Sequence, residues 1–186
     1  MAEYLLRLAA LEEARPIAEI NATAWRETYA GLIPAAALAS IDLDNWTLRW
    51  LDRIGSSESG QAVFVALEDG VPVGFGRCSR HSNPKLVPLG FEGDIASIYL
   101  LRRVQRRGLG RRLMARLAEH LMVIGCASAA VWVLRDATKA RGFYEALGAA
   151  PLGVEGVWEV EGAVLPDLAY GWRDLRMLTE RASPVR

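Results

Sequence analysis

Arginine and glycine residues gather between an expected strand and an expected helix. The segment spans residues 102–111, reads RRVQRRGLGR, and holds five arginines and two glycines. Amide N–H groups in the first turn of a helix have no partner inside the helix, and the helix dipole adds positive potential there. Gly108 and Gly110 would let the backbone approach an anion without an obstructing Cβ, and the arginines could pair with phosphate oxygens. The segment therefore predicts a pyrophosphate site.

Other phosphate-binding patterns do not fit this segment. The chain has no Gly-x-x-x-x-Gly-Lys-Ser/Thr sequence, and a dinucleotide fingerprint would need a third glycine near Leu113. An alternative interpretation is purely structural, with the glycines turning the chain and the arginines forming a solvated surface.

The elements around this segment follow from periodicity. Runs of apolar residues between turn signals predict strands, and recurrences every three or four residues predict helices. We expect strands over residues 4–9, 62–67, 71–78, 94–101, 128–134, 153–160 and 163–172. We expect helices over residues 11–29, 109–124 and 138–147, and a second helical region over residues 34–54 that is split near Asp42. Asp69-Gly70 and Glu161-Gly162 mark hairpin turns, and residues 79–93 form a long loop.

Composition limits the class of protein. The 186 residues carry 22 Lys+Arg and 22 Asp+Glu, so a protein dedicated to nucleic acid is not expected. The N-terminal residues show no secretory or transit pattern, and no apolar run is long enough to cross a membrane, which predicts a soluble cytoplasmic protein. Cys78, Cys126 and the two histidines are scattered, and no His-Glu-x-x-His sequence occurs, so we expect no metal.

Two ordered motifs resemble those of one enzyme family. Residues 105–110, QRRGLG, resemble the Gln/Arg-x-x-Gly-x-Gly/Ala signature of the GNAT superfamily of acyl-CoA N-acetyltransferases. Residues 140–148, ARGFYEALG, resemble the Ala-x-x-Phe-Tyr-Glu-x-x-Gly element that follows it in these enzymes. The resemblance implies an α/β fold of this family, with a mixed sheet of about seven strands and four or five helices. It also implies a single acetyltransferase domain over residues 1–175, and we expect a partly disordered tail over residues 176–186.

The resemblance assigns a set of residues to acetyl-CoA. The amides between Arg106 and Arg111 would hold the pyrophosphate, and the edge of the fourth strand would pair with the pantetheine arm and polarise the thioester carbonyl. The cofactor-binding candidates are Ile98, Tyr99, Leu100, Gln105, Arg106, Arg107, Gly108, Leu109, Gly110 and Arg111.

Acid and base candidates also follow from the family position. Tyr144 matches the family tyrosine and would give a proton to the departing thiolate. Asp94 stands where similar enzymes carry glutamate and would be the general base, directly or through a water molecule, with Glu92 as its rival. Two departures from the family pattern, Ala137 in place of a frequent asparagine and Arg102 in place of a frequent proline, put coenzyme A binding in question.

The acceptor region lies in the first helices. Residues 25–34, WRETYAGLIP, resemble a segment of a group of bacterial GNAT proteins, and Trp25 and Tyr29 could wall an amine pocket because they lie four positions apart. The leading hypothesis is direct acetyl transfer from acetyl-CoA to a primary amine, with a small molecule as acceptor and with a homodimer as one option for assembly. Alternatives are acetylation of a protein N-terminus or lysine, and a non-catalytic CoA-binding regulatory module.

Overall fold

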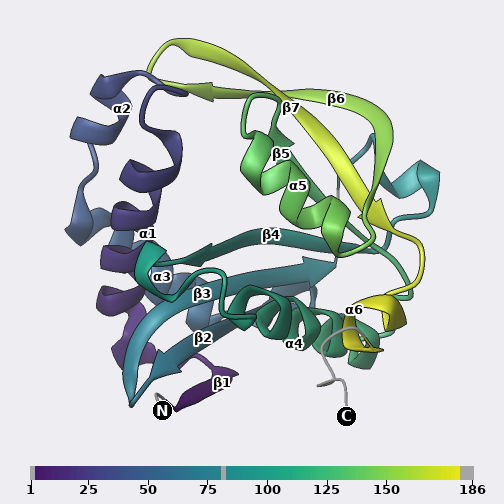
Figure 1. Ribbon diagram of the computed structural model, residues 1–186, viewed down its shortest axis with the longest axis horizontal. Coiled ribbons are helices and arrows are strands. Elements are labelled where there is room, and N and C mark those ends of the chain that lie inside the picture. The colour runs from purple at the N-terminus through teal and green to yellow at the C-terminus, as the bar shows by residue number, and fades with distance from the viewer. Residues whose placement is uncertain (1–2, 81–82, 181–186) are drawn as a thin grey trace.

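The seven strands form one mixed sheet in the order β1-β2-β3-β4-β5-β7-β6. The structure is a computed structural model that describes residues 3–80 and 83–180 (Figure 1). The strands are β1 (Tyr4–Leu8), β2 (Ala62–Glu68), β3 (Val71–Arg80), β4 (Gly93–Leu100), β5 (Ala129–Leu134), β6 (Ala150–Val160) and β7 (Ala163–Trp172). Within this part of the chain, β4 and β5 run parallel and the other neighbours run antiparallel. This confirms the expected mixed sheet.

Both predicted hairpin turns are present. The turn between β2 and β3 places Asp69 at φ 50° and Gly70 at φ 82°, and the turn between β6 and β7 places Glu161 at φ 46° and Gly162 at φ 74°. Two-residue turns with two positive φ angles match the twist of the strands that they join. β6 is the last strand of the sheet, and it can therefore begin at Ala150 and include a proline, earlier than the sequence predicted.

Six α-helices are present in the described part of the chain, against four or five expected. They are α1 (Ala14–Tyr29), α2 (Ala35–Ala39), α3 (Leu43–Gly55), α4 (Leu109–Val123), α5 (Thr138–Ala146) and α6 (Arg176–Glu180). The five-residue α2 is the first part of the second helical region, and the helix that was not expected is the five-residue α6. α6 lies in the segment predicted as a tail and packs near α4 with Leu178 buried; residues 181–186 of that predicted tail lie outside the described residues.

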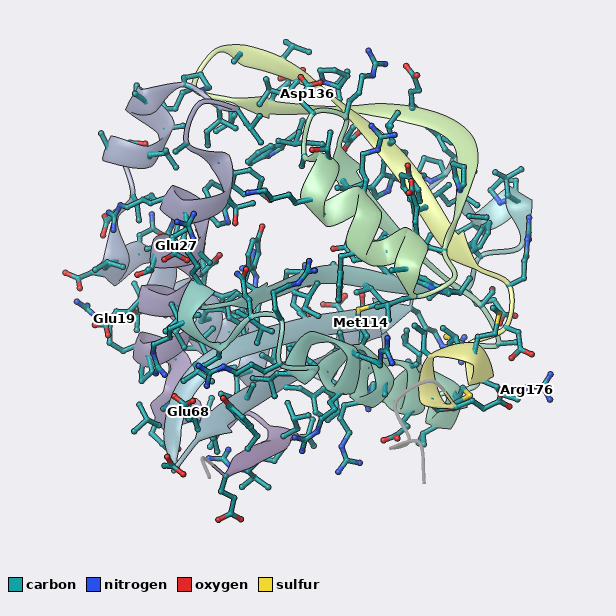
Figure 2. The ribbon with its side chains drawn as sticks, in the orientation of Figure 1. Glu19, Glu27, Glu68, Met114, Asp136 and Arg176 are labelled. Carbon is teal, nitrogen blue, oxygen red and sulfur yellow. The ribbon has the colours of Figure 1, made fainter. Side chains whose placement is uncertain are left out.

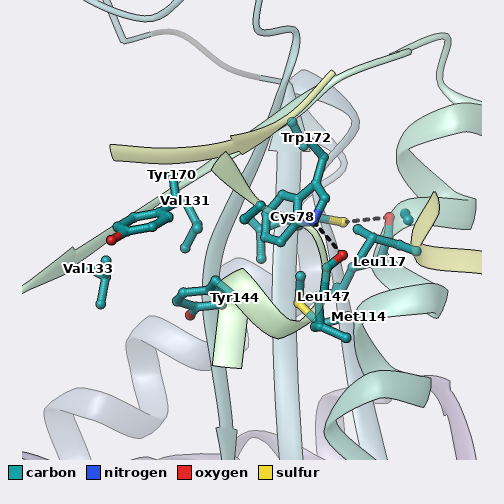
Figure 3. Close-up of a cluster of buried hydrophobic side chains, with 14 of the residues drawn as sticks. Cys78, Met114, Leu117, Val131, Val133, Tyr144, Leu147, Tyr170 and Trp172 are labelled. Atoms are coloured by element: carbon teal, nitrogen blue, oxygen red, sulfur yellow. Dashed lines mark hydrogen bonds between the residues drawn. The ribbon is translucent and has the colours of Figure 1, made fainter. Parts of the chain in front are cut away.

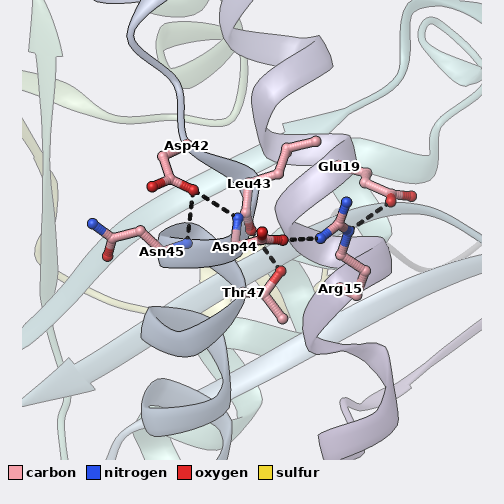
Figure 4. Close-up of polar contacts among 7 residues, drawn as sticks. All are labelled: Arg15, Glu19, Asp42, Leu43, Asp44, Asn45 and Thr47. Carbon is pink, nitrogen blue, oxygen red and sulfur yellow. Dashed lines mark hydrogen bonds and ion pairs between the residues drawn. The ribbon is translucent and has the colours of Figure 1, made fainter.

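The predicted split of the second helical region falls at Asp42. The Asp42 carboxylate accepts hydrogen bonds from the backbone N–H groups of Asp44 and Asn45, which satisfies two free donors at the start of α3 (Figure 4). Arg15 of α1 then pairs with Glu19 and with Asp44, so it ties α1 to the first turn of α3.

The helices cover the two faces of the N-terminal half of the sheet (Figure 1). On one face, Ile17 of α1 and Trp50 of α3 are buried together with Phe75 of β3. On the other face, α4 approaches so closely that a Cβ on Gly76 of β3 would lie 2.9 Å from Leu117 Cδ1. Burying a leucine side chain of this kind stabilises the fold by about 1.5–3 kcal/mol. The sheet therefore fixes the position at which α4 begins.

Candidate active site

The sheet opens between β4 and β5. In the described strands, these two pair through Gly93 with Ala129 and Asp94 with Ala130 and no further, although β4 continues to Leu100. Figure 1 shows the two strands diverging beyond this point, while β3 follows the other edge of β4 to its end. The free edge of β4 can accept a ligand that carries amide groups, as it would accept another strand.

A β-bulge interrupts β4. Ser97 pairs with Arg77 and Ile95 pairs with Cys78, so Ala96 is one extra residue on β4. A bulge reverses the alternation of side chains between the two faces of a strand.

The bulge brings Asp94 and Tyr99 to the same face. Ile95 packs in the core beneath α4, whereas Tyr99 packs against the core beneath α1 and α3. Asp94, next to Ile95, therefore faces the same side as Tyr99, although an odd number of positions separates them. The predicted cofactor residues Ile98 and Leu100 pack against the core on the α4 side.

The predicted pyrophosphate segment forms a tight turn into α4. Arg106 has φ 62° and Gly108 has φ 79°, and α4 begins directly afterwards at the buried Leu109. The Arg112 N–H closes the first helical bond to the Gly108 carbonyl. The backbone N–H groups ahead of Arg112 belong to the first turn, where no carbonyl of the helix itself is in place to accept them. Gln105 braces the turn, because its side-chain amide donates to the Leu100 carbonyl at 2.8 Å.

The two family motifs meet at Gly110. A Cβ at this position would lie 3.3 Å from the ring of Phe143 in α5, closer than ordinary van der Waals contact. Glycine therefore lets α5 approach the first turn of α4. The two segments are far apart in the sequence, yet their glycine and phenylalanine are in contact.

Two of the arginines are bound to a carboxylate. Glu68, labelled in Figure 2, pairs with Arg103 and lies 3.7 Å from Arg107 Nη1, which also donates to the Tyr4 hydroxyl at 3.1 Å. The hydrogen bond from Tyr4 and the nearby Arg103 hold the pKa of Glu68 below its usual range. These arginine side chains therefore anchor the turn to β1 and β2. Arg106 and Arg111 in the same segment are exposed.

Arg102 has a structural reason to replace a proline. Its backbone N–H donates to the Glu27 carboxylate at 3.2 Å, and Glu27 lies near the end of α1 (Figure 2). Proline has no N–H group and could not make this bond. The departure from the family pattern thus adds a link between α1 and the turn. Ala137 stands at the N-cap of α5, with no side-chain bond to that helix end.

Tyr144 is buried on α5. Its ring lies 5.4 Å from that of Phe143 and 6.1 Å from that of Trp172, and Figure 3 shows its hydroxyl directed away from Trp172. Burial raises the pKa of the Tyr144 phenol, and the nearby Tyr29 raises it further. Tyr144 is therefore a neutral phenol that can donate a proton.

The two candidate bases lie in different environments. The Glu92 carboxylate accepts the Ala127 backbone N–H at 2.6 Å, ahead of the first residue of β4, so it joins the starts of β4 and β5. Asp94 is half-buried on β4, on the face shared with Tyr99 and at the last paired position before the gap.

Aromatic side chains from four elements meet at the end of α1. Trp25 makes edge contacts with Tyr29, with Trp46 of α3 and with Trp158 of β6, at centroid distances of 5.5, 5.0 and 5.3 Å. The Tyr29 hydroxyl lies 2.7 Å from the hydroxyl of Tyr99 on β4. The sequence indicated Trp25 and Tyr29, whereas Trp46, Trp158 and the Tyr99 side chain were missed because their contacts cross the fold.

A pocket of about 260 Å³ adjoins this aromatic cluster. Trp25 and Trp46 line it together with Asp42, Arg49 and Glu161, so its wall is aromatic and carries charges of both signs. Such a wall suits a molecule that is apolar in part and also polar. In the described residues, no group of three or more His, Cys, Asp or Glu side chains could hold a metal ion, and no helix is long and apolar enough to cross a membrane.

The opened sheet and the helix that starts beside it define a class of protein, the acyltransferases that take their acyl group from coenzyme A. The sequence model of the acetyltransferase (GNAT) family matches residues 13–149 of the chain. The chain belongs to this family and is an acetyl-CoA-dependent acyltransferase.

Relatives cover nearly the whole chain. The N-acetyltransferase YuaI of Bacillus subtilis, whose own function is uncharacterised, is 33% identical over 174 residues, which are 93% of this chain and 95% of YuaI. Among solved structures, the PaiA N-acetyltransferase of Thermoplasma acidophilum in complex with coenzyme A has a TM-score of 0.68 at 17% identity, covering 89% of this chain and 98% of its own. The ribosomal-protein-alanine N-acetyltransferase of Brucella melitensis has a TM-score of 0.68 at 21% identity, covering 90% of this chain and 98% of its own. These structural likenesses confirm the fold.

Proposed function

We propose that the protein transfers the acetyl group of acetyl-CoA directly to the primary amine of a small molecule. The observation that carries this proposal is the free edge of β4 beside the turn into α4, with the buried Tyr144 on the helix whose Phe143 contacts Gly110 after that turn. A thioester held along this edge would lie within reach of a neutral phenol.

Acetyl-CoA would bind across the gap. The residues present fit it, because Gly108 takes a positive φ at the turn and no other atom lies within 4 Å of a Cβ built on it, which leaves space beside the amides. The amides from Arg106 to Arg111 would hold the pyrophosphate. The β4 edge at Ile98, Tyr99 and Leu100 would pair with the pantetheine amides.

The acid and base would act at the two ends of the transfer. The amine nitrogen attacks the carbonyl carbon, the new C–N bond forms, and the C–S bond breaks. Asp94 would take the proton that the amine loses, directly or through a water molecule. Tyr144 would give its proton to the departing sulfur, and the proton that Asp94 took from nitrogen would then pass to the Tyr144 oxygen through solvent. Glu92 is the rival candidate for the base; it lies ahead of β4, where its carboxylate accepts the Ala127 N–H.

The acceptor would bind on the side of α1. Trp25 and Tyr29 form an aromatic wall, and the neighbouring pocket of about 260 Å³ has room for a small molecule rather than a folded protein surface. The lining carries the Arg49 guanidinium as well as the carboxylates of Asp42 and Glu161, so it offers partners to both signs of charge on an acceptor.

A thermal-shift experiment followed by a thiol-release assay tests the proposal. Acetyl-CoA at about 100 times its Kd should raise the free energy of unfolding by about 2.7 kcal/mol, because it binds the folded state alone. The same samples are then mixed with polyamines, aromatic amines, amino acids and short peptides. Thiol release with a small amine supports the proposal. Release with peptides alone would assign a protein acceptor, and a thermal shift without release on any amine would favour the non-catalytic module.

A further inference from the structure

The carboxylate of Glu68 gathers two arginines of the turn at the place where β1 begins and β2 ends (Figure 2). Glu68 is the cross-strand partner of Tyr4, so the two side chains lie on the same face of the sheet. The Tyr4 O–H donates to Glu68 Oε1 at 2.8 Å, and Arg103 pairs with Glu68 Oε2. Arg107 Nη1 donates to the Tyr4 hydroxyl oxygen at 3.1 Å and lies 3.7 Å from Glu68 Oε1.

The contacts in this group have a fixed direction. A guanidinium can only donate, so the Tyr4 oxygen accepts from Arg107 and the Tyr4 proton goes to Glu68. The Glu68 side chain is 14% exposed, whereas those of Arg103 and Arg107 are 53% and 56% exposed. A carboxylate that is largely withdrawn from water needs charged partners, so it holds the two arginines more firmly than an exposed surface pair would.

A third arginine joins the start of α4 to the same strand. Arg112 Nη2 donates to the Tyr4 carbonyl oxygen at 3.1 Å. Val104 before the turn and Leu109 after it are 0% and 1% exposed, and both belong to the core cluster that includes Leu6 of β1. The two ends of the turn are therefore fixed against the first strands of the sheet.

Between these fixed ends the turn contains an unfavourable backbone conformation. Arg106 has φ 62°, in the left-handed region. For a residue with a Cβ this conformation costs free energy, and it persists where the surrounding structure determines it. Arg103 and Arg107 stand on either side of Arg106 in the sequence, and Glu68 holds both of their side chains. Glu68 is thus placed to keep the amides of the turn in one arrangement.

We propose that Glu68 and Tyr4 are positioning residues for coenzyme A: they hold Arg103 and Arg107 as braces of the turn, and the backbone amides of the turn bind the pyrophosphate. Glu68 and Tyr4 act through the two arginines and do not touch the ligand. The inference rests on the proposed function, and it gives two of the five arginines in residues 102–111 a part other than direct phosphate contact. In the opposite arrangement, Glu68 would compete with the phosphates for these arginines, and removal of its charge would strengthen binding.

The variant E68Q tests the sign of this effect. Glutamine keeps the size of the side chain and an acceptor oxygen but removes the charge, so the bonds to both arginines weaken. We expect the Kd of coenzyme A, measured by isothermal titration, to rise about tenfold, because displaced amides fit the phosphates less well. S-acetyl-pantetheine lacks the pyrophosphate, so its kcat/KM in the acetyl-transfer assay should stay within about twofold of the wild type.

A double-mutant cycle separates a brace from a phosphate ligand. R107A should raise the Kd of coenzyme A about tenfold in the wild-type protein and less than about twofold further in E68Q, because the brace is already weakened there. A guanidinium that contacts the phosphate directly would lose the same factor in both backgrounds. Y4F removes the hydroxyl between Arg107 and Glu68, and it should raise the Kd by a smaller factor than E68Q does.

E155Q is the matched control. It removes the charge from the ion pair of Arg135 Nη2 and Glu155 Oε2, 2.7 Å apart, in which Glu155 belongs to β6 at the other edge of the sheet. Its Kd for coenzyme A should equal that of the wild type.

Three results would overturn the role of Glu68 and leave the acetyltransferase function standing. They are an E68Q protein that binds coenzyme A as tightly as the wild type or more tightly, an equal loss with acetyl-CoA and S-acetyl-pantetheine, and an equal loss from R107A in both backgrounds. Wild-type protein that binds acetyl-CoA and releases no thiol with any amine would overturn the proposed transfer, and the binding cycle would still decide the role of Glu68.

Discussion

At the scale of single residues, Tyr144 has the environment of a proton donor. Its phenol is buried among Phe143 and Trp172, and its raised pKa keeps the proton in place at neutral pH. We predict that Y144F lowers kcat by about tenfold to a hundredfold, because the departing thiolate loses its proton source. Isothermal titration should give a Kd for coenzyme A within about twofold of the wild type. A proportional loss of coenzyme A binding would instead mean that the hydroxyl holds the cosubstrate.

Asp94 and Glu92 form a matched pair of carboxylates for testing the base. The bulge turns Asp94 toward the face of Tyr99, whereas Glu92 holds the Ala127 amide. We predict that D94N lowers kcat about a hundredfold, since the amide cannot take the amine proton. E92Q should keep the rate near that of the wild type, because its side-chain oxygen still accepts the backbone N–H. The reverse order of the two rates would assign the base to Glu92.

The two thiols are protected by burial. Desolvation raises the pKa of the Cys78 thiol to about 12, and it also raises the pKa of Cys126. We predict that neither reacts with a disulfide reagent in the native protein at pH 8 within the time of an assay, so released coenzyme A can be read directly. Stability tied to Cys78 is fully present below pH 9.0, the ordinary value, and is lost as the pH rises toward 12. Urea midpoints measured from pH 7 to 11 should therefore fall only at the alkaline end.

At the scale of elements, the turn before α4 depends on backbone conformation. Gly108 has φ 79°, which strains any residue with a Cβ. We predict that G108A costs about 1 kcal/mol of stability and weakens acetyl-CoA binding at least tenfold, because the amides of the turn shift. Gly142 is the matched control. It lies inside α5 with no other atom within 4 Å of a built Cβ, so G142A should stabilise the protein by about 0.5–1 kcal/mol and leave the Kd unchanged. Equal affinities for G108A and wild type would exclude the turn as the pyrophosphate site.

The same elements show how far sequence could predict the site. The turn, the helix that follows it and the Asp69-Gly70 hairpin could be predicted because glycine and apolar spacing act locally. The Ala96 bulge, the Glu92 bond to Ala127 and the Tyr29–Tyr99 pair could not, because each depends on a partner from a distant strand or helix. Local patterns predict the elements that form the candidate site, whereas long-range contacts decide which side chains face one another.

At the scale of the whole molecule, the proposed site lies at a discontinuity in the sheet. The strands β1–β4 on one side and β5–β7 on the other are joined in the sheet by two residue pairs among those described, and helices cover the rest. A ligand that bridges β4 to β5 would therefore hold the two parts together. The stabilisation by such a ligand should be concentrated along the gap between β4 and β5 rather than spread through the core.

Hydrogen exchange can measure this localisation. We predict that acetyl-CoA slows exchange of amides over residues 97–111 and in the first turn of α5, since the free edge of β4 and the start of α4 gain partners. The β1–β2 pair, which is joined along its whole length, should exchange at the same rate with and without the ligand. G108A should lose the protection over residues 105–111 and keep part of that on β4, because the pantetheine edge does not depend on the turn. Uniform slowing over all seven strands would show general stabilisation, and the opened sheet would then not be where the ligand binds.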